Sequence, residues 1–399
     1  MHRTVKISIW LLIAFVGNCM SNISIGQVNN FGIKNSFFVE PVFQTGKILD
    51  IYPDFPERGV AFFTGVNFSW QTVGKSWWNS YYKFPQAGIM LLYGSLGNKD
   101  VLGSNISIVP NISFKIAGKN RFSLEALLGM GFAWFNKPYD IIDNPENIVI
   151  GSHITNITML SFNGIYSVSK KFEIVLGVSA QHYSNGHIQI PNVGANIPVA
   201  NLGFKYFPGG SPDKYFSPDS IFRFDKKLKF VFRMGMGVHE FASPTIPVGG
   251  PKYPVYVASA YLSKRLSIIT NLVFGLQGNY YVSYYDFITS NNFYTDNQQL
   301  KSIRLIAFGG VEMIMGRFGF LLQLGFNVYN PFYKDLQGLN ENTSGFKNFT
   351  KKYISSKLGA QYYILNPVKT TKLKPFVGIF LNGNAGQADF VEVAVGCGF

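Results

Sequence analysis

The sequence predicts an all-β protein, an antiparallel transmembrane β-barrel of about 16 strands. Segments of alternating apolar and polar residues recur along the chain between turn residues, which is the pattern of barrel strands. The 399 residues are 16% aromatic and only 14% charged, against about 25% charged residues in soluble domains. After the amino-terminal region, no run of about 20 apolar residues could form a transmembrane helix.

The first 26 residues resemble a secretory signal peptide, to be cleaved before Gln27. A basic start precedes the apolar run 7–16, which is too short to span a bilayer. A lipoprotein signal ending at Cys19 is the less favoured alternative. Cleavage leaves Cys397 as the single cysteine, so no disulfide within the chain is expected.

Sixteen segments have the length and composition of barrel strands. In the first half they centre on residues 38–43, 62–68, 89–93, 106–114, 122–132, 154–166, 172–184 and 199–207. In the second half they centre on residues 230–238, 255–262, 268–281, 303–313, 318–328, 353–364, 376–381 and 390–399. Because one or more of them could be plug or loop structure, 12 to 16 strands are possible.

The turn-rich stretch 207–227 divides the chain into two halves. The expected parts are the signal peptide 1–26, a barrel half 27–210, and an additional barrel half or second barrel, 211–399. Eight segments on each side suggest a duplication.

The last segment carries an apolar stripe on one face: Val391, Val393, Val395, Cys397 and Phe399. A stripe that ends in a carboxyl-terminal phenylalanine is similar to the final strand read by the outer-membrane barrel insertion machinery. That machinery is therefore an expected partner through Phe399. An ordinary edge strand is the alternative.

The formal net charge of +14 has two interpretations. The basic residues could attract the phosphates of an anionic lipid surface, or they could be solvated turn residues, as at Lys170-Lys171. Their scatter and the signal peptide disfavour nucleic acid as a partner. Because no His, Cys and carboxylate cluster has metal-site spacing and no phosphate-binding motif is present, neither a metal nor a cofactor is expected.

Segment 172–184 ends in two polar residues on its apolar face. Alternation places seven residues on this face: Phe172, Ile174, Leu176, Val178, Ala180, His182 and Ser184. In a membrane barrel this face contacts lipid. A serine hydroxyl needs a base to become a nucleophile, and His182 is two residues away. The pair suggests an enzyme that cuts lipids, although an isolated His-x-Ser is more often two polar residues in the headgroup zone.

A longer pattern adds His182-Tyr183-Ser184-Asn185, then Pro191-Asn192, then Asn196, on a strand, loop and strand. It resembles the lipid A 3-O-deacylase (PagL-like) and acyloxyacyl hydrolase family of outer-membrane barrels. The resemblance covers about the first half of the chain, most sharply residues 172–207. It implies a bacterial outer-membrane serine esterase that removes an ester-linked acyl chain from lipid A, or from another acylated membrane lipid.

The resemblance also implies roles for individual residues. The nucleophile falls on Ser184, the base on His182, and the oxyanion donors on Asn192 and the backbone N–H of His187, with Asn185 as a further candidate. The family's triad carboxylate falls on Asn196, which can orient His182 but carries no charge. Asp140, Asp143 and Glu240 are candidate substitute acids.

Two other functions stay open, namely a pore or uptake channel and a barrel that binds lipid without turnover. We take the stretch 327–331 as the position in the second half that corresponds to this motif, and it contains neither histidine nor serine. If the amino terminus is periplasmic, odd-numbered strands run outward. The loop 185–197 then faces the cell exterior.

Overall fold

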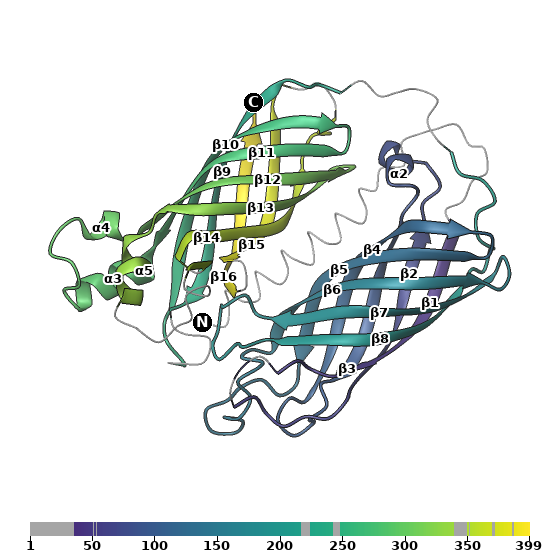
Figure 1. Cartoon of the computed structure of the whole chain (residues 1–399), viewed down its shortest axis with the longest axis horizontal. Coiled ribbons are helices and arrows are strands. Elements are labelled where there is room, and N and C mark those ends of the chain that lie inside the picture. The colour runs from purple at the N-terminus through teal and green to yellow at the C-terminus, as the bar shows by residue number, and fades with distance from the viewer. Residues whose placement is uncertain are drawn as a thin grey trace.

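The computed structural model describes residues 36–50, 52, 54–216, 224–241, 248–338, 349–350, 352–368, 372–384 and 387–399. The expected signal peptide lies outside them. These residues form two closed barrels of eight antiparallel strands each (Figure 1). The prediction of an all-β barrel protein with about 16 strands is confirmed, since each of the sixteen segments corresponds to one strand.

The first barrel consists of β1 (Ser36–Gly46), β2 (Ala61–Gln71), β3 (Gln86–Ser95), β4 (Ser104–Lys119), β5 (Phe122–Phe135), β6 (Ile154–Ser167), β7 (Phe172–Ser184) and β8 (Ala195–Tyr206). A short helix, α2 (Trp77–Tyr81), lies between β2 and β3. Pairing of β1 with β8 closes the barrel, with Val42 opposite Gly203.

The second barrel consists of β9 (Leu228–Glu240), β10 (Lys252–Ser267), β11 (Thr270–Tyr281), β12 (Ile303–Met315), β13 (Phe318–Tyr329), β14 (Ile354–Tyr363), β15 (Lys374–Asn384) and β16 (Gln387–Gly398), closed by the pairing of β16 with β9. Its connections carry α3 (Val282–Ser290), α4 (Gln298–Lys301) and α5 (Pro331–Gly338). In the part of the chain that the structure describes, no helix is long and apolar enough to cross a membrane.

The topology corrects one comparison between the two halves. The seventh strand of the second barrel is β15, so the counterpart of the β7 end is residues 381–384. The stretch 327–331 instead spans the end of the fifth strand, β13, and the two residues after it. Residues 381–384 read Leu-Asn-Gly-Asn and also contain no histidine and no serine.

Alternate residues of each strand face opposite sides of the barrel wall. On β7, Leu176 and Val178 are each 60% exposed, whereas Val175 is 2% exposed. On β16, Val393 is 63% exposed and Glu392 is fully buried. An apolar outer surface with polar residues inside is the arrangement of a membrane barrel, because lipid replaces water around it.

Side chains fill both barrel interiors, as expected of eight-stranded barrels. The first interior contains the ion pair Lys205–Glu125 at 2.8 Å, and the second contains Lys357–Glu392 at 2.6 Å. Arg233 is fully buried beside Glu392. These buried networks stabilise the barrels in place of disulfides, since Cys397 is a free thiol.

Candidate active site

The predicted base and its orienting residue face each other across two strands. His182 on β7 lies directly opposite Asn196 on β8. Directly opposed side chains in an antiparallel pair lie on the same face and contact each other. The His182 Nδ1 atom is 2.7 Å from Asn196 Oδ1. With the amide oxygen as acceptor, the imidazole carries its proton on Nδ1 and Nε2 is left as the base.

Ser184 is the last residue of β7 and is 8% exposed. The Gly186 N–H donates to Ser184 Oγ at 3.1 Å. A Cβ added at Gly194 would lie 3.3 Å from His182 Cε1 and 3.5 Å from Ser184 Cβ. The base and the serine therefore both lie next to the Gly194 backbone, and a side chain at Gly194 would crowd the His182 ring.

The site loop, residues 185–194, turns sharply after the serine. Gly186 and His187 have φ values of 66° and 68°, in the left-handed region. Gly186 adopts this conformation without a Cβ penalty, and the turn directs its N–H toward the hydroxyl. A backbone donor thus lies within hydrogen-bonding distance of the Ser184 hydroxyl.

Two asparagines hold the site loop together. The Asn185 N–H donates to Asn192 Oδ1 at 3.1 Å, so the amide oxygen of Asn192 is occupied and Nδ2 is its donor end. Asn185 Nδ2 donates to Gln189 O at 2.7 Å and to Ser152 Oγ at 3.2 Å. In this conformation Asn185 therefore fixes the loop, whereas Asn192 keeps an amide donor.

The connection between β5 and β6, residues 136–153, supports the site loop. The N–H groups of Val193 and Gly194 each donate at 3.1 Å, to the carbonyl oxygens of Ile148 and Val149. Asp140, a candidate substitute acid, accepts hydrogen bonds from the Asp143 and Ile142 N–H groups, which lower the pKa of its carboxyl. Asp140 and Asp143 are exposed in this connection, and the partner of His182 Nδ1 is Asn196.

Two polar residues beside the site were missed by sequence reasoning. On β6, Asn156 lies opposite Ser184 and Thr158 lies opposite His182. The Thr158 hydroxyl donates to Asn156 Oδ1 at 2.9 Å. The available signal was a pair of polar residues at alternate positions in segment 154–166, but pairing them with β7 requires the strand register.

The second barrel contains another serine next to a histidine. His239 Nε2 lies 2.9 Å from Ser283 Oγ, and His239 Nδ1 lies 3.4 Å from Asp389 Oδ1. Ser283 is 1% exposed and His239 is 3% exposed. Asp389 also accepts hydrogen bonds from Tyr281 and Arg304. The group belongs to the buried polar network of this barrel.

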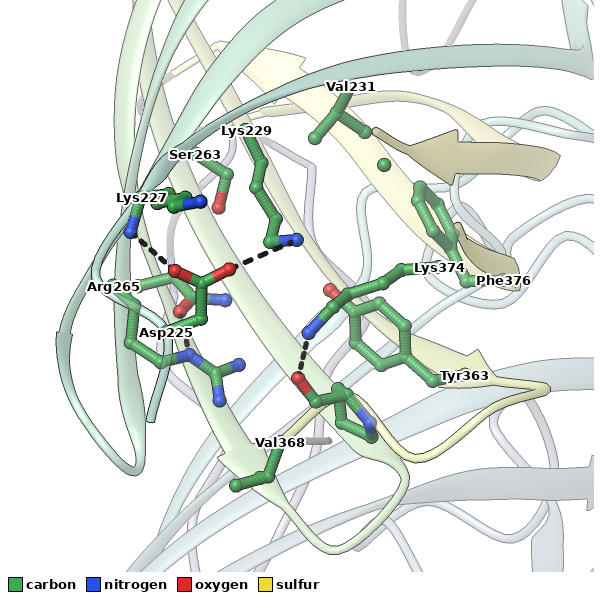
Figure 2. A pocket seen from close by; sticks show the side chains of 13 residues that line it. Asp225, Lys227, Lys229, Val231, Ser263, Arg265, Tyr363, Val368, Lys374 and Phe376 are labelled. Carbon is green, nitrogen blue, oxygen red and sulfur yellow. Dashed lines mark hydrogen bonds and ion pairs between the residues drawn. The ribbon is translucent and has the colours of Figure 1, made fainter. Parts of the chain in front are cut away.

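The pocket in Figure 2 lies at the opposite end of the second barrel, where β9 begins. It contains none of the predicted site residues. Its cations have protein partners: Lys229 pairs with Asp225 at 3.6 Å, Arg265 donates to Asn271, and Lys374 donates to Pro367 O. Among the described residues, no group of three or more His, Cys, Asp or Glu side chains could hold a metal ion.

Comparison with known proteins finds one family model that matches part of the chain. Residues 64–205 match the family model of lipid A 3-O-deacylase (PagL). The crystal structure of the outer membrane enzyme PagL is similar at 17% identity and a TM-score of 0.32, covering 41% of this chain and 97% of that chain. No curated protein matches.

An outer membrane channel from Pseudomonas putida F1 is also similar, at 10% identity and a TM-score of 0.19, covering 94% of this chain and 100% of that chain. The family match agrees with the resemblance found in the first half of the sequence. The chain is an outer-membrane β-barrel protein that is PagL-like in its first half.

Proposed function

We propose that the first barrel is a serine esterase that removes an ester-linked acyl chain from lipid A. The family match over residues 64–205 supports the reaction class and the substrate. The observation that carries the proposal is the hydrogen bond between His182 and Asn196 on the lipid-facing surface, beside Ser184. An uncharged orienting residue holds the base there.

In the proposed reaction, Ser184 Oγ attacks the ester carbonyl carbon while His182 Nε2 takes its proton. The Gly186 N–H and the Asn192 amide stabilise the oxyanion, with the His187 N–H as the donor that the resemblance adds. The protonated His182 then gives its proton to the leaving alkoxide. Water attacks the acyl-enzyme with the same base, and the fatty acid is released.

The outer surface of β7 offers a path for the acyl chain. Leu176, Val178 and Ala180 are exposed on the same face as His182 and lead toward it. Because this face contacts the acyl layer, an acyl chain that lies along β7 would be directed toward the site from within the membrane. The net charge of +14 favours a substrate that carries phosphate groups.

Hydrolysis of a p-nitrophenyl acyl ester by the protein in detergent tests the proposal. Ser184→Ala should abolish hydrolysis. Ser283→Ala is the matched control, because Ser283 is hydrogen-bonded to His239 inside the second barrel and should be dispensable. Wild-type rates of hydrolysis by Ser184→Ala would show that Ser184 is not the nucleophile.

The neutral Asn196 favours one second candidate, a barrel that binds acylated lipid without cleaving it. An amide cannot stabilise the imidazolium as a carboxylate does. Saturable binding of lipopolysaccharide with no release of fatty acid, from the wild-type protein, would support this candidate over the esterase.

A further inference from the structure

The second barrel contacts the site loop of the first. Figure 1 places the end of the second barrel at which β9 finishes and β16 begins beside the end of the first barrel at which β7 finishes and β8 begins. β7 and β9 both end at this junction, at Ser184 and Glu240. Consequently a residue of the second barrel can act on the loop that carries the proposed oxyanion donors.

Glu240 makes the polar contacts of this junction. Its Oε2 atom accepts a hydrogen bond from the Ile190 N–H at 2.9 Å, and its backbone N–H donates to His187 O at 3.1 Å. Its Oε1 atom accepts from the Gly250 N–H at 2.6 Å. Glu240 is 1% exposed, and a buried carboxylate persists only where such donors replace its water.

Apolar side chains of the second barrel complete the contact. A Cβ added at Gly186 would lie 2.7 Å from Val391 Cγ2 and 3.4 Å from Leu381 Cδ1. Val393 and Val395, further along the same outer face of β16, are 63% and 60% exposed. The lipid-facing stripe of β16 thus becomes partly covered where it meets the site loop.

We propose that the second barrel holds the site loop in its active conformation, and that Glu240 is the positioning residue that makes this contact. This inference rests on the proposed esterase function. By holding Ile190 and His187, Glu240 fixes both halves of the site loop. The Gly186 N–H and Asn192 lie on either side of these anchors, so their positions relative to Ser184 depend on the second barrel.

The geometry separates this role from that of a substitute triad acid. Both Glu240 oxygens accept backbone N–H groups, and the partner of His182 Nδ1 is Asn196. A triad acid would change the pH dependence of the rate through His182. A residue that only positions the loop changes kcat through loop geometry and does not change the pH profile of kcat/KM.

The test compares Glu240→Ala, Glu240→Gln and the control Asp296→Ala, an exposed acid of the second barrel. We expect Glu240→Ala to lower kcat by about tenfold or more, since small displacements of catalytic groups carry such costs. KM and the pH profile should stay near wild type. Glu240→Gln keeps one acceptor oxygen and should recover part of kcat. This variant provides the test if the alanine variant does not fold.

Hydrogen exchange in the site loop provides the second measurement. Peptides covering residues 185–194 should exchange faster in Glu240→Ala, whereas β1–β6 peptides should not change. Wild-type kcat, unchanged hydrogen exchange in the loop or a shifted pH profile in the Glu240 variants would each contradict the proposed positioning role of Glu240. Full activity in Ser184→Ala would instead contradict the proposed esterase mechanism. The hydrogen-exchange result would still decide whether Glu240 holds the site loop.

Discussion

At the scale of single residues, the candidate site depends on the cross-strand pair of His182 and Asn196. Their 2.7 Å contact follows from strand register, because the two residues are directly opposed. The amide selects the imidazole tautomer that a serine esterase needs. It leaves the imidazolium formed during the reaction without a compensating charge.

Asn196→Asp is therefore expected to raise kcat, by about tenfold or more, because a charged partner stabilises the imidazolium. The measurement is the pH dependence of p-nitrophenyl ester hydrolysis, with Asn291→Asp as an exposed control. A lower rate at every pH would show that the amide is required as it is.

Gly194→Ala is expected to reduce activity by about tenfold or more, because a Cβ there would clash with the end of β7 and crowd the His182 ring. Gly194 has a φ of 76°, and its Cβ would lie 2.8 Å from Tyr183 O. Gly209→Ala is the matched control, since a Cβ at Gly209 meets nothing within 4 Å. Equal ester hydrolysis by the two variants would contradict the packing of His182 and Ser184 against Gly194.

At the scale of elements, the hydrophobic pattern predicted the strands because each strand has one lipid-facing side. The same pattern placed His182 and Ser184 on the outer face of β7, and the family resemblance assigned Asn196 as the partner of His182. The positions of Asn156 and Thr158 beside the site, and the contact of Glu240 with the site loop, could not be predicted in this way. Their contacts depend on the register of β6 with β7 and on the packing of one barrel against the other, and neither is encoded locally.

The contact between the site loop and β16 predicts a coupled pair of substitutions. Gly186→Ala should lower kcat because the new Cβ would meet Val391 Cγ2 at 2.7 Å and because φ is 66°. Adding Val391→Ala removes the steric part, so the double variant should recover some activity, while the backbone strain persists. Strictly additive losses in hydrolysis rate would show that the two residues do not interact.

At the scale of the whole molecule, the chain is two packed barrels rather than one wide one. Buried side chains such as Lys205, Arg233 and Lys357 occupy the interiors. An eight-stranded barrel of this kind is just wide enough for its own side chains. The channel alternative would need an open lumen, which wider barrels provide.

Planar-bilayer recordings should accordingly show no stable conductance from the purified protein. The filled interiors oppose ion passage, since moving an ion through them requires displacing paired charges. A porin of known conductance is the positive control. Stable single-channel steps in the wild-type protein would favour the channel over the two-barrel esterase.

The central claim is that Ser184 cleaves an acyl ester of lipid A. Mass spectrometry of lipid A from cells that produce the wild-type protein or Ser184→Ala tests it most directly. The wild-type sample should lack one ester-linked acyl chain that is retained with Ser184→Ala. Identical lipid A in the two samples, whether intact or deacylated, would contradict the claim.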